Sequence, residues 1–94
     1  PFMVMKEFIN QAEQAHLTVT QTNRMWNVLM CESKFKYDAK NPKSSALGVT
    51  QFINSTWNKI APKGSSRHNY KLSLSLFIQY FQTNPGWWSP CLCK

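Results

Sequence analysis

The sequence predicts a mostly α-helical fold of one domain, and three observations support this prediction. The chain has 94 residues, which leaves room for a single hydrophobic core. Apolar residues recur at helical spacing in four segments, and the stretches between them contain Pro, Gly, Asn and Ser. The composition is 43% apolar and 14% aromatic, which is too rich in core-forming residues for a disordered chain. We therefore expect one domain over residues 1–94, with few or no strands.

The first predicted helix covers residues 5–16, with apolar side chains on one face and polar side chains on the other. The second is expected to follow Thr22 or Asn23, either of which can cap a helix, and to cover residues 24–33. This second segment is apolar nearly all round, which is typical of a helix in the middle of a domain.

The second half of the chain predicts a loop, two further helices and a folded-back tail. The loop covers residues 34–45, and a short helix follows at 54–61, before Pro and Gly. The longest helix is expected at 69–82, where two apolar stripes indicate that it is buried. Asn-Pro-Gly at 84–86 ends it, and the tail at 87–91 is expected to fold back onto the domain.

Three cysteines stand at positions 31, 91 and 93, and their spacing fits no zinc pattern, so no metal or other cofactor is expected. In so small a chain, a disulfide between Cys31 and the C-terminal region is the favoured interpretation. We expect Cys91 as the partner, which leaves Cys93 as the odd thiol. This bond would close a loop of about 60 residues and stabilise the fold by roughly 4 kcal/mol. The alternative is three reduced cysteines in a cytosolic protein.

The net charge of +7 predicts an anionic partner, such as an anionic glycan, a wall polymer or nucleic acid. The basic residues match no nucleic-acid-binding motif, so we favour general attraction to an anionic polymer over specific nucleic-acid binding. No apolar run approaches the length of a membrane span. The sequence opens without the basic and apolar leader of a signal peptide, so we expect a mature product or an excised domain.

Glu32 is the first candidate for acid–base chemistry among the four acidic residues. Glu7 and Glu13 lie on the polar face of the first predicted helix, and Asp38 lies in a loop among lysines. Glu32 instead shares an apolar stripe with Leu29 and its helical neighbours. Desolvation there raises the pKa of a carboxyl group, which is the environment of a general acid for glycosidic cleavage. The alternative is that Glu32 turns aside to bond a backbone amide or its neighbouring serine.

An ordered set of residues resembles the lysozyme-like superfamily, and within it the soluble lytic transglycosylase domain and the resuscitation-promoting factors. The resemblance covers residues 26–57, with a looser match from Trp88 to Cys91. The Ala-Tyr-Asn element common in transglycosylases is absent, and Tyr80 or Tyr70 is a candidate for an equivalent hydroxyl. The matching elements are Cys31-Glu32-Ser33-Lys34-Phe35, Ala39, Ala46-Leu47-Gly48-Val49-Thr50-Gln51-Phe52 and Ser55-Thr56-Trp57.

The resemblance implies a lysozyme-like fold and a lytic transglycosylase that cleaves the β-1,4 bond between N-acetylmuramic acid and N-acetylglucosamine. Glu32 would protonate the glycosidic oxygen, and Gly48 would let a backbone edge approach the sugar. For Gln51 the alternative is an amide that satisfies loop backbone, and for Trp57 a core role is favoured over stacking on a sugar. The expected substrate-binding residues are Ser33, Tyr37, Gly48, Thr50, Gln51 and Tyr80.

The mechanism depends on whether a second carboxylate is present, and only Asp38 is a candidate. Without one, Glu32 acts first as acid and then as base, and the muramic 6-hydroxyl attacks to give a 1,6-anhydro product. The shortage of acids favours this reaction over hydrolysis. The alternatives are a muramidase-type hydrolase, a non-catalytic glycan-binding module and, less favoured, a basic nucleic-acid-binding or membrane-active protein. The expected partners are peptidoglycan strands and anionic wall polymers. We expect a monomeric domain. Its expected location is outside the cell, in the cell wall or periplasm, or on a virion.

Overall fold

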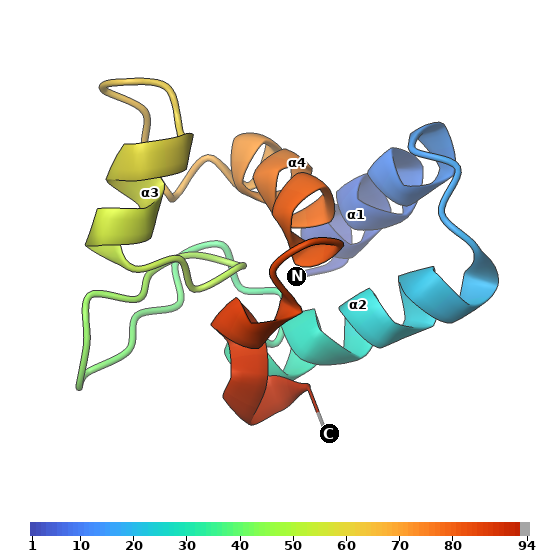
Figure 1. Ribbon diagram of the computed structural model, residues 1–94, viewed down its shortest axis with the longest axis horizontal. Coiled ribbons are helices and arrows are strands. Elements are labelled where there is room, and N and C mark those ends of the chain that lie inside the picture. The colour runs from blue at the N-terminus through green and yellow to red at the C-terminus, as the bar shows by residue number, and fades with distance from the viewer. Residues whose placement is uncertain (93–94) are drawn as a thin grey trace.

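The computed structural model describes residues 1–92 (Figure 1). Within this range, extended structure is limited to two isolated bridges, from Leu47 to Lys40 and from Leu47 to Phe52. The predicted mostly helical fold is therefore confirmed. The helices are α1 (Phe2–Gln14), α2 (Val19–Ser33), α3 (Asn54–Ile60), α4 (Tyr70–Phe81) and the 3₁₀ helix η1 (Pro85–Cys91).

The start of α2 differs from the prediction, because a capping box lies earlier in the chain. The Thr18 hydroxyl accepts a hydrogen bond from the Gln21 backbone N–H at 3.0 Å, and the Gln21 side chain accepts one from the Thr18 N–H at 2.8 Å. These reciprocal bonds satisfy two N–H groups that the first turn leaves without partners. The prediction that Thr22 or Asn23 caps this helix was wrong, because both lie inside its first turns.

The remaining helices lie close to their predicted positions. α1 is shifted towards the N-terminus of the predicted segment 5–16. The Asn69 side chain caps α4 by accepting a hydrogen bond from the Leu72 N–H at 3.1 Å. No helix within residues 1–92 has the length and apolar character needed to cross a bilayer.

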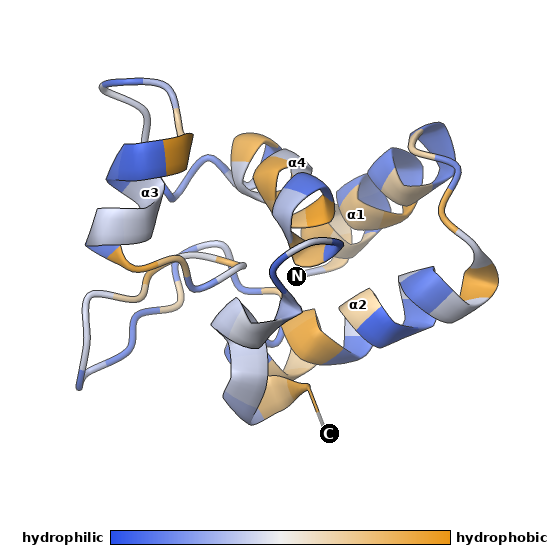
Figure 2. Cartoon of the chain, viewed as in Figure 1, coloured by the Kyte–Doolittle hydropathy of each residue, from blue (hydrophilic) through white to orange (hydrophobic). Residues whose placement is uncertain are grey.

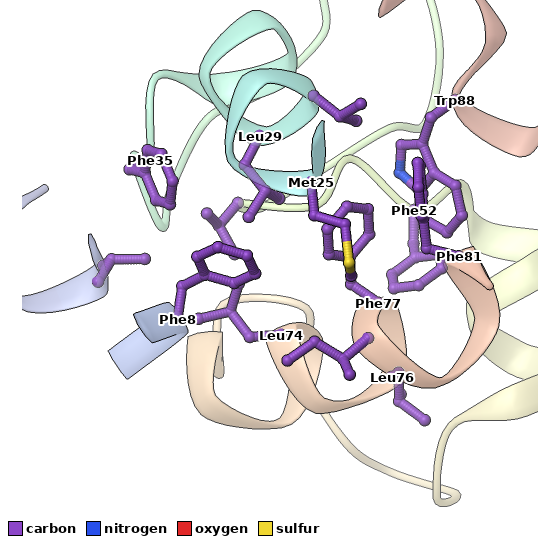
Figure 3. Close-up of a cluster of buried hydrophobic side chains, with 14 of the residues drawn as sticks. Phe8, Met25, Leu29, Phe35, Phe52, Leu74, Leu76, Phe77, Phe81 and Trp88 are labelled. Carbon is purple, nitrogen blue, oxygen red and sulfur yellow. The ribbon is translucent and has the colours of Figure 1, made fainter. Parts of the chain in front are cut away.

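The hydrophobic core lies where α1, α2, α4 and η1 meet. Figure 3 shows side chains from these elements pointing toward one another, among them Phe8, Met25, Phe77 and Trp88. Hydrophobic colour dominates much of α4, which packs against both α1 and η1 (Figure 2). The prediction that this helix is buried is confirmed. In contrast, α2 buries one face only, and Met30 on its other side is 37% exposed.

The tail folds back as predicted, and two bonds fix it. Cys91 at the end of η1 forms a disulfide with Cys31 on α2, so the expected pairing is confirmed. Trp88 is buried, and its indole Nε1 donates a hydrogen bond to the Thr50 carbonyl oxygen at 2.8 Å. η1 therefore connects the end of α2 to the loop between α2 and α3 (Figure 1). Cys93 lies outside the described residues.

Candidate active site

Glu32 lies in the last turn of α2, and both of its sequence neighbours are fixed to other parts of the fold. Cys31 is joined to Cys91 in η1 by the disulfide. The Ser33 hydroxyl donates a hydrogen bond to the Val49 carbonyl oxygen at 2.6 Å. The backbone of Glu32 is therefore held between η1 and residues 48–51, which we call the 48–51 turn.

The surroundings of Glu32 favour its protonated form. The side chain is partly buried, and this burial raises the pKa of its carboxyl group above the usual 4.5. The C-terminal end of a helix also disfavours a negative charge, so its position in α2 acts in the same direction. The predicted desolvation of Glu32 is thus confirmed. Such a carboxyl group holds its proton to a higher pH than an exposed glutamate and is suited to donate it.

Two of the predicted substrate-binding hydroxyls lie in the core. Ser33 is 6% exposed, and its hydroxyl lies within hydrogen-bond distance of the carbonyl oxygens of Leu29 and Val49. Thr50 is 0% exposed, and its Oγ1 lies 2.6 Å from the Ser73 Oγ on α4. The prediction that their side chains hydrogen-bond a sugar is therefore wrong. Both hydroxyls instead hold the 48–51 turn against the helices behind it.

Gly48 is required by the fold itself. Its φ is +84°, and a Cβ at this position would overlap the backbone carbonyl oxygen of Arg67. The segment around Arg67 therefore occupies the side of Gly48 that was expected to face a sugar, and that prediction is corrected.

Gln51 ends the 48–51 turn in a left-handed conformation with φ of +59°. Its side-chain Nε2 donates hydrogen bonds to the carbonyl oxygens of Ala39 at 3.0 Å and Gly48 at 2.8 Å. The structure thus shows the alternative interpretation, in which the Gln51 amide hydrogen-bonds the backbone of the loop. Gln51 is still partly exposed and borders the pocket described next.

A pocket and a wider groove lie along α3 and η1, and we call them together the aromatic groove. The pocket has a volume of about 140 Å³, and the groove beside it about 590 Å³. Thr56 and Trp87 line both, so the pocket and the groove adjoin one another. The pocket is lined by Gln51, Phe52, Ile53, Thr56, Trp87 and Trp88, and the groove by Ser55, Thr56, Lys59, Ile60, Tyr80, Asn84 and Trp87.

Trp87 is the functional candidate that sequence reasoning missed. It is 46% exposed, and its ring stacks on that of Tyr80 with centroids 5.7 Å apart and an angle of 20° between the planes. Exposed tryptophan with an open face is uncommon and frequently marks a binding surface. The signal in the sequence was the pair of adjacent tryptophans after the predicted end of the last helix. Trp88 is buried in the core, whereas Trp87 is exposed.

The other predicted residues lie elsewhere. Tyr37 is exposed, and its ring forms a T-shaped pair with the His68 ring, with the two centroids 6.5 Å apart. Asp38 is exposed and borders a different pocket. Trp57 is buried and donates a hydrogen bond from Nε1 to the Ser65 carbonyl oxygen at 3.2 Å, which confirms its favoured core role. Of the predicted binding residues, the structure thus brings Gln51 and Tyr80 to the aromatic groove.

Residues 1–92 contain no group of three or more His, Cys, Asp or Glu side chains arranged to hold a metal ion. Comparisons of the chain with protein families, with curated proteins and with solved structures found no match. The resemblance to lytic transglycosylases therefore rests on the sequence elements alone.

Proposed function

We propose that this chain is a peptidoglycan-cleaving lytic transglycosylase domain with Glu32 as its single acid and base. The observation that carries the proposal is the setting of Glu32, whose pKa burial raises and whose two neighbours are fixed to η1 and to the 48–51 turn. These two elements also supply Trp87 and Gln51 to the aromatic groove. Glu32 itself does not line this groove, so its link to the groove is their shared attachment to η1 and the 48–51 turn. Cleavage of a polysaccharide requires a proton donor held in a fixed position beside the bound glycan.

The aromatic groove suits a glycan strand. The apolar faces of sugar rings pack on exposed aromatic faces, and Trp87 on Tyr80 offers such a face. Side chains such as Ser55, Thr56 and Asn84 supply hydrogen-bonding groups for sugar hydroxyl and N-acetyl substituents.

In the proposed reaction, protonated Glu32 donates its proton to the oxygen between N-acetylmuramic acid and N-acetylglucosamine, and the bond from the muramic C1 to that oxygen breaks. The 6-hydroxyl of the same muramic residue then attacks C1. Glu32, now a carboxylate, accepts the hydroxyl proton and returns to its starting state. The product is 1,6-anhydro-N-acetylmuramic acid, the N-acetylglucosamine leaves with a free hydroxyl, and no water enters.

The shortage of acidic residues favours this route over hydrolysis. A hydrolase of the usual type places a second carboxylate about 5–9.5 Å from the acid, across the same glycosidic bond. Asp38 is the only other candidate carboxylate for this role, and its side chain is exposed. The substrate's own N-acetyl carbonyl, as the resemblance implies, would stabilise the positive charge at C1 instead. The disulfide fits an oxidising location, such as the wall, the periplasm or a virion.

The test compares the native chain with Glu32→Gln on purified bacterial sacculi, with mass spectrometry of the released muropeptides. The expected result is anhydro products from the native chain and none from the variant. Glu13→Gln is the matched control, because it removes the same charge from an exposed position on α1 and should retain activity. Products with free reducing ends would indicate a hydrolase, and activity lost in Asp38→Asn would place the second carboxylate there. Binding to sacculi without any cleavage by the native chain would indicate a glycan-binding module.

A further inference from the structure

A second pocket, separate from the aromatic groove, lies between the loop after α2 and the segment before α4. It has a volume of about 410 Å³, and we call it the basic pocket. Besides the Asn54 amide, three basic side chains, two hydroxyls and one carboxylate line it. These are Lys40, Arg67, His68, Ser44, Ser45 and Asp38.

Arg67 is held rigidly in this pocket by neutral groups. Its Nη1 donates to the carbonyl oxygens of Ser45 and, at 2.7 Å, Phe52, and its Nη2 donates to the side-chain oxygen of Asn54. Because none of these acceptors is charged, they orient the guanidinium without neutralising it. Within residues 1–92, three of its five N–H donors make these bonds, which leaves two for a further acceptor. Partial burial lowers the pKa of Arg67, because desolvation disfavours the charged form of the guanidinium.

The two serine hydroxyls each accept one hydrogen bond from the backbone. Ser44 Oγ accepts a hydrogen bond from the Ala46 N–H at 3.1 Å, and Ser45 Oγ accepts one from the Asn54 N–H at 3.0 Å. A hydroxyl whose oxygen accepts from the backbone still has its own hydrogen to donate. The basic pocket therefore presents a fixed guanidinium and two hydroxyl donors, with an ammonium and an imidazole beside them.

We propose that the basic pocket binds a phosphate group of a polyol phosphate polymer. Donors that converge from several side chains match the oxygens of a tetrahedral phosphate better than those of a planar carboxylate. The volume exceeds that of a phosphate ion alone, so part of the attached alcohol also enters. Asp38 is the one carboxylate that lines the pocket. In this proposal it accepts a hydrogen bond from a hydroxyl of that alcohol. The binding does not depend on cleavage by Glu32, since the two sites share no lining residue.

The test is an NMR titration of the ¹⁵N-labelled chain with glycerol 3-phosphate, with inorganic phosphate and with acetate at equal ionic strength. We expect saturable shifts at residues of the basic pocket with glycerol 3-phosphate, weaker binding of inorganic phosphate and no saturation with acetate. Lys40→Gln and His68→Gln should each weaken glycerol 3-phosphate binding by about fivefold or more, since a charge-assisted bond is lost. The control Lys71→Gln removes an exposed charge on α4 and should change the affinity less than about twofold.

Two further measurements test the role of the alcohol and distinguish specific binding from general charge attraction. Asp38→Asn should lower the affinity for glycerol 3-phosphate relative to that for inorganic phosphate, and an unchanged ratio would overturn the role given to the alcohol. Poly(glycerol phosphate) should bind more tightly than a duplex DNA of equal charge. Saturation by acetate, tighter binding of DNA, or equal losses in Lys71→Gln and Lys40→Gln would each overturn the proposal in favour of general charge attraction. Arg67 is left unchanged in these variants, because its hydrogen bonds to Ser45, Phe52 and Asn54 hold the loop between α2 and α3 in place.

Discussion

The Ser33 hydroxyl and the Val49 carbonyl oxygen, 2.6 Å apart, join the last turn of α2 to the 48–51 turn. Ser33 directly follows Glu32 and is itself buried. In the Glu-Ser pair, the first residue supplies a partly buried carboxyl group, and the second fixes the backbone that carries it. Because its hydroxyl is used within the core, we assign Ser33 a positioning role.

Ser33→Ala should therefore lower both stability and cleavage. The buried Val49 carbonyl oxygen loses its donor, which costs about 1–3 kcal/mol in free energy of unfolding by urea. The rate of muropeptide release should fall through kcat more than through KM, because the position of Glu32 changes while the aromatic groove stays intact. Full activity in a variant destabilised by this amount would contradict the positioning role.

Gly48→Ala should destabilise the protein more than Gly64→Ala. Both glycines have positive φ, but an added Cβ meets the Arg67 carbonyl oxygen at Gly48 and no atom within 4 Å at Gly64. The backbone conformation alone costs about 1–2 kcal/mol for alanine, and the overlap adds about 1–3 kcal/mol at Gly48. Urea denaturation of the two variants measures the difference. Equal losses would mean that the Arg67 segment moves aside freely.

Sequence patterns were sufficient for the features that depend on neighbouring residues. The periodicity of apolar side chains located α3 and α4 closely, and the same reasoning found the desolvated setting of Glu32. The start of α2 was misplaced because the capping box at Thr18 stands apart from the apolar repeat, in a polar stretch. Local hydrogen bonds between polar residues leave no periodic signal.

Residues of the 48–51 turn were misassigned because distant segments decide their surroundings. Thr50 pairs with Ser73 on α4, and Gly48 lies under the backbone of Arg67. Neither contact has a pattern in the sequence near the turn. A motif match can thus identify a turn correctly while the side chains within it face the core rather than a ligand.

Loss of the disulfide should reduce stability strongly. The bond joins residues 60 apart in the sequence, and closing a loop of this size contributes about 4 kcal/mol in the chain-entropy model. A double variant, Cys31→Ser with Cys91→Ser, should melt roughly 20 °C lower by calorimetry. Cys93→Ser is the control, because it keeps both bonded cysteines and should melt like the native chain. A shift of only a few degrees would mean that packing of Trp88 alone holds η1.

Trp87→Ala should weaken glycan binding with little loss of stability, since almost half of its surface is exposed. The effect is best measured by calorimetry in the non-cleaving Glu32→Gln background, with soluble peptidoglycan fragments. Loss of one stacking face should weaken the free energy of binding by about 0.5–1.5 kcal/mol, which raises Kd by up to about tenfold. Phe2→Ala in the same background removes an exposed aromatic ring from α1 and should leave Kd unchanged. Equal affinities in the two variants would place the glycan outside the aromatic groove.

Glu32→Gln should stabilise the protein near neutral pH and lose this advantage in acid. Burial raises the pKa of the Glu32 carboxyl in the folded protein above the value of 4.5 expected in the unfolded chain. Above the folded-state pKa, both states are ionised, and only the folded state bears the cost of desolvating the charge. As the pH falls through that pKa and below 4.5, the carboxyl becomes neutral in both states and the cost disappears.

Urea denaturation of both proteins across the acid and neutral range measures this difference. Glutamine carries no charge at any pH, so the free energy of unfolding of Glu32→Gln should exceed that of the native chain at about pH 7 and approach it below the unfolded-state pKa. Glu13→Gln, at an exposed position, should show no such gain. A variant that is less stable than the native chain at neutral pH would mean that the Glu32 carboxylate is stabilised in the fold. Glu32 would then be a poor proton donor, since a residue selected for acid catalysis is held in its protonated form at the expense of stability.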